Sequence, residues 1–163
     1  MSDLPNNTDD RRASLTRDIT AQTGIDEAMI ERLVRTFYQS IRADAVLGPI
    51  FNARVANWDE HIAKLCAFWS SVTLMSGRYH GQPMQAHVAL PVQRSHFDRW
   101  LDLFEQTAIE TCGPDAAAHF VVRARRIADS LELGIASAHG RIVAPRHAER
   151  NATLRPPAQG RQG

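Results

Sequence analysis

Apolar residues recur every three or four positions along most of this 163-residue chain, which is the spacing of one face of an α-helix. The first such stretch follows Gly24, with Asp26 as a suitable N-cap, and it ends near Asp44. This spacing predicts a first long amphipathic helix. Its apolar face consists of Ile30, Leu33, Val34, Phe37, Tyr38 and Ile41.

A second helix is expected after an interruption of this pattern. Gly48 and Pro49 break the periodicity, which predicts a tight corner that brings in Ile50 and Phe51. Asn57 then stands where its side chain can cap the next helix. The apolar face of this second helix consists of Trp58, His61, Ile62, Leu65, Phe68, Trp69 and Val72.

Two more helices are expected over residues 93–112 and 115–139, separated by a Gly-Pro pair. Before them, residues 76–91 hold two glycines and two prolines without a long period, so we expect a loop with one helical turn at residues 84–88. No stretch alternates as a strand would, and the predicted fold class is all-α. The last two apolar faces consist of Phe97, Trp100, Leu101, Phe104 and Ala108, then Phe120, Ala124, Ile127, Ala128, Leu131 and Ile135.

The length of the chain and its composition indicate one compact domain with polar ends. Residues 1–23 are polar, with little support for a short helix near residues 15–22, so we predict a flexible N-terminal arm. Residues 24–139 form the predicted helical domain. Residues 140–163 are rich in arginine and proline and are predicted to be a disordered tail.

The charge balance excludes two classes of partner from the prediction. Nineteen basic residues against 18 acidic ones leave a net charge of +1, which is no electrostatic footprint for nucleic acid or an anionic membrane. The N-terminus lacks the pattern of a signal peptide, and the longest apolar run, Leu65 to Trp69, is too short to cross a bilayer. We therefore expect a soluble cytoplasmic protein, with Cys66 and Cys112 reduced.

Three side chains with polar groups lie at positions that ordinary core packing does not explain. Tyr38 and His61 project from apolar faces, and His87 lies in the irregular segment between the second and third helices. Neutral imidazole is the commonest metal ligand in proteins, but the spacing of His80, His87 and His96 is not that of a zinc site. A half-exposed tyrosine, a core histidine and a surface-loop histidine stay open as simpler interpretations.

The chain lacks phosphate-binding glycine motifs and the nucleophile elbow of hydrolases, so nucleotide and acyl-transfer chemistry have no support. Many aromatic residues are instead predicted to face one interior. They would suit a large flat apolar ligand, although aromatic stripes also simply pack against each other. These residues are Phe37, Tyr38, Phe51, Phe68, Trp69, Phe97, Trp100 and Phe104.

Four segments, in a fixed order and spacing, carry a resemblance to a known family. They are Phe37-Tyr38 with Leu47-Gly48-Pro49-Ile50-Phe51, Trp58-Asp59-Glu60-His61 with Phe68-Trp69, Tyr79 to Pro91, and His96-Phe97 with Trp100-Leu101 and Leu103-Phe104. Over residues 26–139 the chain resembles the group III truncated haemoglobins. The resemblance implies a truncated globin fold, in which a two-over-two helical sandwich surrounds a b-type haem.

The resemblance also implies a role for each site residue. His87, at the end of a Gly-x-Pro-x-x-x-His segment, corresponds to the histidine that binds the haem iron. Tyr38 corresponds to a tyrosine that donates a hydrogen bond to the bound ligand, Trp100 to a second donor, and His61 to a histidine that borders or gates the pocket. The aromatic residues that the resemblance places against the haem are Phe51, Phe68 and Trp69.

The function implied by this resemblance is the binding of dioxygen, nitric oxide or other diatomic ligands at a pentacoordinate haem b. Several donors in a dry pocket slow ligand release, which favours nitric oxide dioxygenase or peroxidase-like activity supplied with electrons by a reductase. A non-catalytic oxygen carrier or ligand sensor is the alternative. A haem-free helical bundle acting as an interaction module is the third interpretation, and whether His61 gates the pocket or binds iron stays open.

Overall fold

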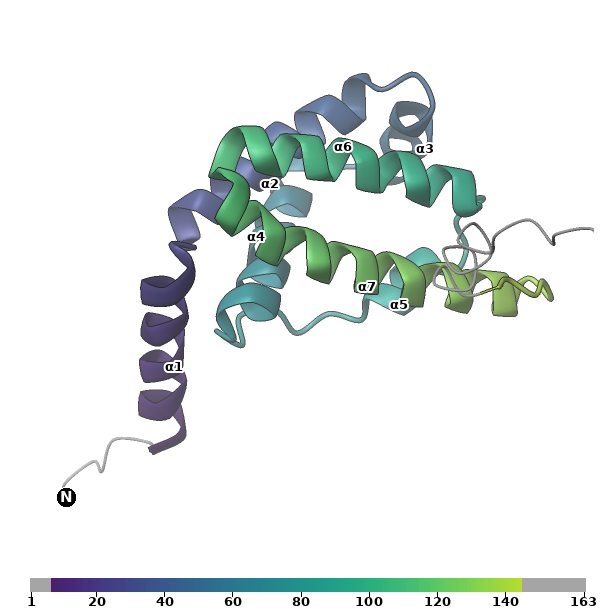
Figure 1. Ribbon diagram of the computed structural model, residues 1–163. Coiled ribbons are helices and arrows are strands. Elements are labelled where there is room, and N and C mark those ends of the chain that lie inside the picture. Colours follow the sequence, from purple (N-terminus) through teal and green to yellow (C-terminus); the bar gives the residue numbers. More distant parts are fainter. Residues whose placement is uncertain (1–6, 145–163) are drawn as a thin grey trace, which may run out of the picture.

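The fold is described from a computed structural model, which describes residues 7–144 (Figure 1). Over these residues the chain forms helices and loops without a strand, so the all-α prediction is confirmed. The helices are α1 (Asn7–Thr23), α2 (Glu27–Ala43), α3 (Leu47–Arg54), α4 (Trp58–Leu74), α5 (Pro83–His87), α6 (Arg94–Cys112) and α7 (Pro114–Ala138).

Two helix pairs form the body of the molecule. One pair is α6 and α7, which run side by side after a turn at Gly113 and make the most extensive contact of the fold (Figure 1). The other pair is α2 and α4, and it packs on the first through α2 against α6 and α4 against α7. This is the two-over-two arrangement that the resemblance implied. The short helix α5 contacts α7.

The helices begin close to the predicted positions because their caps are encoded locally. The Asp26 side chain accepts a hydrogen bond from the Met29 N–H at 2.8 Å, and the Asn57 side chain accepts one from the Glu60 N–H at 3.1 Å. Gly113, with a φ of 80° and a ψ of 164°, adopts a positive-φ conformation that favours glycine, and it separates α6 from α7. The predicted boundaries of these long helices are therefore confirmed to within two residues.

Aromatic rings fill the space between the two helix pairs. The ring of Phe104 stacks on Trp69 with centroids 5.0 Å apart and on Trp100 with centroids 5.2 Å apart. Phe37 meets Phe104 edge-on at 5.1 Å, and Phe120 is fully buried beside Trp69. Such pairs add about 0.5–1.5 kcal/mol each beyond the area they bury. The aromatic side chains between the two helix pairs thus form one continuous core.

The predicted corner at Gly48 and Pro49 is wrong, because both residues belong to the first turn of α3. The chain turns earlier, where the Asp44 carboxylate accepts hydrogen bonds from the N–H groups of Val46 and Leu47. Proline is tolerated in a first helical turn, where its missing N–H needs no partner. Glycine is required at position 48, since a Cβ there would lie 2.7 Å from the carbonyl oxygen of Arg42.

The arm predicted at residues 1–23 is helical from Asn7 onward, as α1. This helix extends away from the body in Figure 1 and buries none of its residues, so it carries no apolar stripe from which a helix could be predicted. Thr16 attaches it to the body by donating a hydrogen bond of 2.7 Å to the Leu74 carbonyl. The predicted disorder of the tail concerns residues that, from 145 onward, lie outside the described ones.

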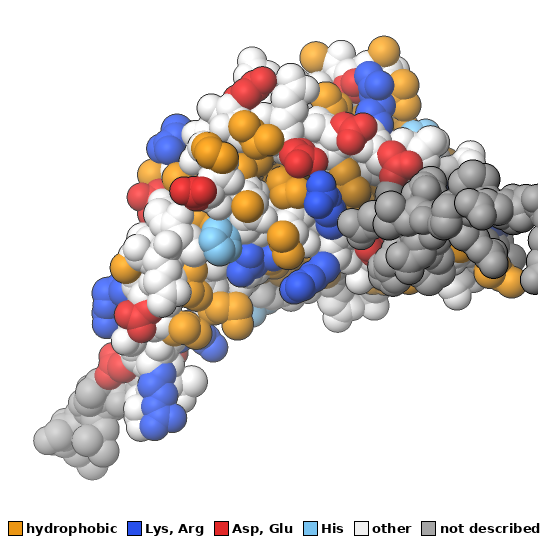
Figure 2. All heavy atoms as spheres, viewed as in Figure 1, with side chains coloured by type: hydrophobic (Ala, Val, Ile, Leu, Met, Phe, Trp, Pro, Cys, Tyr) orange, Lys and Arg blue, Asp and Glu red, His pale blue; other side chains and the backbone are white. Residues whose placement is uncertain are grey.

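The face of the molecule shown in Figure 2 carries acidic and basic side chains side by side over α6 and α7, with apolar side chains between them. Neither sign of charge dominates this face, in line with the net charge of +1 for the whole chain. Within residues 7–144, none of the helices has the length and apolar character needed to cross a membrane.

Candidate functional site

A cavity of about 550 Å³ lies between the two helix pairs and the segment that carries α5. Each site residue predicted from the sequence lines this cavity, and they are Tyr38, Phe51, His61, Phe68, Trp69, His87 and Trp100. The cavity is also lined by residues of the predicted apolar faces and of the segment after α4, among them Leu65, Phe97, Ile127, Leu131 and Tyr79. The volume and the aromatic walls suit a large, flat, mainly apolar ligand.

One wall of the cavity is the short helix α5, which ends at His87. The His87 ring is half-buried, and its Nδ1 atom lies 2.5 Å from the carbonyl oxygen of Pro83, one turn earlier. A carbonyl oxygen only accepts hydrogen bonds, so Nδ1 carries the hydrogen and the neutral ring keeps a lone pair on Nε2. Histidines that bind metals are commonly oriented in this way by a bond from the other ring nitrogen.

Pro83 and Gly134 account for the position of α5. Pro83 starts the helix with a pre-set φ, and α5 buries none of its five residues. Its Met84 side chain packs so closely on α7 that a Cβ at Gly134 would overlap the sulfur atom. The helix is therefore positioned by one close contact and by local hydrogen bonds rather than by an apolar face.

The opposite wall is formed by Tyr38 on α2 and Trp100 on α6. Tyr38 is only 4% exposed, and its ring packs edge-on against Phe37 at 4.9 Å and Phe51 at 6.0 Å. Burial raises the pKa of Tyr38, and a hydrogen bond with the Trp100 side chain acts in the opposite direction. Because the indole N–H can only donate, the Tyr38 oxygen accepts this bond and keeps its own hydrogen for donation.

His61 on α4 completes this wall. Its half-buried ring stands edge-on to Tyr38 at 6.0 Å and to Trp58 at 5.6 Å, and the Arg42 guanidinium lies 4.7 Å from the centroid of the Trp58 ring. Burial lowers the pKa of His61, with smaller contributions in the same direction from Lys64 and from His87 when its ring is protonated. The neutral ring is therefore favoured near pH 7.

Cationic side chains also line the cavity, and the sequence interpretation missed them. They are Lys64 on α4 and Arg78 in the segment after α4. Neither belongs to an apolar stripe, so periodicity carried no signal for them. Among residues 7–144, no group of three or more His, Cys, Asp and Glu side chains could hold a metal ion by itself.

A short two-over-two helical fold with a histidine and a tyrosine on opposite walls of an aromatic cavity defines a globin-type protein. Residues 21–127 match the family model described as bacterial-like globin. The chain belongs to this family, and membership implies haem-based ligand binding.

Two relatives make the likeness more specific. A group 3 truncated hemoglobin of Campylobacter jejuni is 40% identical over 88 residues, which are 51% of this chain and 69% of that protein. The crystal structure of group III truncated hemoglobin from Campylobacter jejuni matches with a TM-score of 0.62 and 35% identity, over 66% of this chain and 89% of that one. The predicted truncated globin fold and the resemblance to group III are confirmed.

Proposed function

We propose that this protein binds one haem b in the cavity, with His87 as the protein ligand of the iron, and that the haem binds dioxygen, nitric oxide and other diatomic ligands. One observation carries the proposal. The hydrogen bond from His87 Nδ1 to Pro83 leaves the Nε2 lone pair available at a cavity whose other wall holds the Tyr38 hydroxyl.

The residues present fit a haem in their chemistry. The aromatic side chains of Phe51, Phe68 and Trp69 offer flat apolar surface for the macrocycle. Lys64 offers positive charge for one of the two carboxylates that a b-type haem carries, while the Arg78 guanidinium is paired with Glu27. When bound, the haem supplies an iron centre for diatomic ligands, and the surrounding side chains decide how tightly a ligand is held.

Tyr38 is the side chain proposed to hold the diatomic ligand. A ligand that gains negative charge is stabilised by a donor that is already fixed in a water-poor pocket. The Trp100 indole N–H fixes the Tyr38 oxygen and leaves the hydroxyl hydrogen for the ligand. Trp100 thus acts mainly through Tyr38, and His61 borders the same pocket.

We propose that His61 stays off the iron, so that the haem is pentacoordinate without a diatomic ligand. The support is its packing between the rings of Tyr38 and Trp58, with Arg42 behind Trp58. Moving the imidazole to a metal would cost these contacts.

Strong retention of a diatomic ligand makes a poor carrier, so we propose turnover rather than transport. Reaction with nitric oxide or peroxide, as a nitric oxide dioxygenase or a peroxidase-like enzyme, requires electrons, and the proposal therefore includes a reductase partner. A carrier or ligand sensor is the alternative. We further propose a cytoplasmic location, where the unpaired Cys66 and Cys112 would stay reduced.

The test is a titration of the purified chain with haemin, followed by reduction and carbon monoxide. We expect a sharp Soret band that saturates at one haem per chain and shifts with carbon monoxide. A featureless spectrum would leave only a helical bundle. Supplying excess nitric oxide to the oxygenated protein, with dioxygen and a reductant, then separates an enzyme, which keeps forming nitrate, from a carrier, whose haem is oxidised once and then stops reacting.

A further inference from the structure

The segment between α4 and α5 forms part of the cavity wall without regular structure. After Leu74 the chain turns through two left-handed residues, Met75 with a φ of 57° and Gly77 with a φ of 69°. The residues that follow line the cavity as far as Pro83. Such a segment has no ladder of backbone hydrogen bonds, so its position has to come from side chains.

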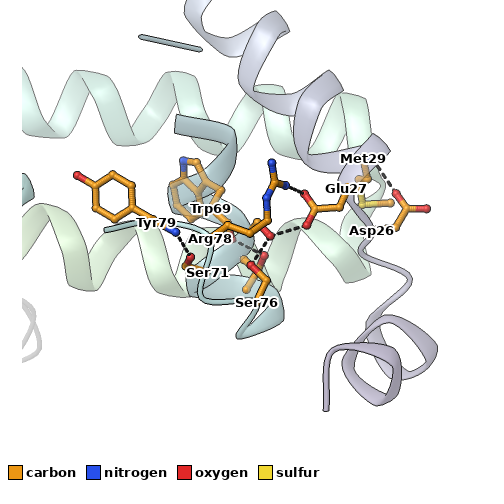
Figure 3. Close-up of polar contacts among 10 residues, drawn as sticks. Asp26, Glu27, Met29, Trp69, Ser71, Ser76, Arg78 and Tyr79 are labelled. Atoms are coloured by element: carbon orange, nitrogen blue, oxygen red, sulfur yellow. Dashed lines mark hydrogen bonds and ion pairs between the residues drawn. The ribbon is translucent and has the colours of Figure 1, made fainter. Parts of the chain in front are cut away.

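A polar network on the far side of this segment provides that position (Figure 3). Ser70 on α4 is fully buried at 0% exposure, and its hydroxyl lies 2.5 Å from Glu27 Oε1 and 2.6 Å from the Ser76 hydroxyl. Arg78 donates to the other oxygen, Glu27 Oε2, at 2.6 Å. Glu27 therefore joins α2 to residues 43 and 51 positions further along the chain.

A separate hydrogen bond holds the residue that follows Arg78. The N–H of Tyr79 donates to the Ser71 hydroxyl at 2.9 Å. In Figure 3, Arg78 reaches toward Glu27 while the ring of Tyr79 points the opposite way. That ring meets Phe68 edge-on with centroids 5.3 Å apart and lines the cavity. Polar contacts on one side of the segment thus set an aromatic wall on the other.

Glu27 is the centre of this network because it uses both carboxylate oxygens. Its two partners come from different segments, and neither Ser70 nor Arg78 is joined to the other directly in these contacts. Charge-assisted hydrogen bonds are the stronger kind, and a carboxylate in the first turn of a helix is also favoured by the helix dipole. Removing the carboxylate would release both tethers at once.

We propose, building on the haem binding proposed above, that Glu27 is a positioning residue for the haem cavity. By accepting hydrogen bonds from Ser70 and Arg78 it fixes residues 75–82, of which 78–82 line the cavity, and so slows the loss of haem. It acts at a distance from the cavity, through the segment that it holds.

Helix α1 supports the same segment from a second direction. Thr16 donates to the carbonyl of Leu74, the last residue of α4. The Arg12 guanidinium lies close over Gly77, where a Cβ would be 3.1 Å from it. Residues from α1, α2 and α4 therefore converge on one stretch of chain, as expected if its position matters for the cavity.

The first test compares haem loss from two matched variants of the haem-loaded protein. Glu27→Ala removes the network, whereas Glu31→Ala removes an exposed carboxylate one turn along α2, paired with Arg35 at 2.9 Å. Transfer of haem to an excess of apomyoglobin, followed by the Soret band, should be about tenfold faster for Glu27→Ala and within about twofold of wild type for Glu31→Ala. Equal rates in the two variants would overturn the proposal.

A second readout does not involve haem. Hydrogen exchange of the haem-free chain should quicken at the amides of residues 76–81 in Glu27→Ala and stay unchanged in α6. Unchanged exchange at residues 76–81, or an equal increase in α6, would reject the positioning role even in a protein that binds haem. A chain that takes up no haem but shows this local change would refute the proposed function and leave the role of Glu27 in place.

Discussion

The two walls of the cavity are built in different ways. Tyr38 and Trp100 project from long helices, and the Tyr38 ring is locked into an aromatic core at 4% exposure. His87 lies on a five-residue helix that buries none of its residues, after a segment tethered by Glu27 and the α4 serines. Helix packing fixes the wall proposed to hold the gas, while a few hydrogen bonds fix the wall proposed to hold the iron.

Loss of His87 is expected to have the largest effect. His87→Ala removes the only lone pair proposed to bind the iron, so the Soret band of the reconstituted protein should collapse or broaden. His80→Ala is the matched control, because His80 lines the same cavity from the neighbouring segment. If both variants kept a wild-type band, the iron would not depend on this wall.

Tyr38→Phe tests the opposite wall. Removing the hydroxyl should speed dioxygen release by about 5- to 150-fold, since such a donor contributes about 1–3 kcal/mol. Stopped-flow displacement of dioxygen by carbon monoxide measures this rate. The control is Tyr79→Phe, which removes a hydroxyl from the other tyrosine of the cavity and should leave the rate unchanged. A similar rate in all three proteins would reject the role proposed for Tyr38.

Substitution of Asp44 tests whether the stability of the packed wall also depends on a polar contact at its edge. The Arg99 guanidinium donates to the Asp44 carboxylate at 2.5 Å and lowers the pKa of Asp44 to about 2. Burial raises this pKa, and a hydrogen bond from the N–H of Leu47 lowers it further. Asp44→Asn should lower Tm by about 3–6 °C at pH 7, while Asp102→Asn on the exposed face of α6 should change it by less than about 1 °C.

The pH dependence of this difference follows from the lowered pKa. A carboxyl with a depressed pKa in the folded state stabilises it fully above its usual pKa of 3.8, and this contribution is lost as the pH falls toward 2. The Tm gap between wild type and Asp44→Asn should therefore stay constant from pH 7 to about 5 and narrow below about 4. A gap that persists at pH 2 would show that the charge of Asp44 is not the cause.

The smallest effect is expected at Gly134, where α5 docks on α7. Gly134→Ala forces the Met84 side chain aside, and Met84 is flexible enough to move. The gain in helix propensity, up to about 1 kcal/mol, offsets the disturbed contact. Haem loss should stay within about threefold of wild type. An increase of tenfold or more would mean that α5 is held by rigid packing, and the contrast between the two walls would fail.

The same contrast explains what the sequence could and could not predict. Tyr38, His61 and Trp100 lie on apolar stripes of long helices, so periodicity alone predicted that they face one interior. His87 lies in a segment without a period, and the role of iron ligand proposed for it came only from the resemblance to a family. The apolar pattern gave little support for α1, because none of the residues of that helix is fully buried.

Other features depend on contacts that periodicity does not encode. The hydrogen-bond partners of Glu27 are Ser70 and Arg78, which lie 43 and 51 positions further along the chain. Local spacing cannot predict contacts over such sequence separations. The turn before α3 was misplaced because Pro49 was interpreted as a break, whereas a first helical turn accepts it. Lys64 and Arg78 line the cavity with charged side chains, which a search for apolar stripes passes over.

The most direct test of the site is resonance Raman spectroscopy of the ferrous, haem-loaded protein. If His87 is the ligand, wild type should show an iron–histidine stretching band that disappears in His87→Ala and returns as an iron–imidazole band when imidazole is added. A band that persists unchanged in His87→Ala would mean that another residue binds the iron and would contradict the proposed site.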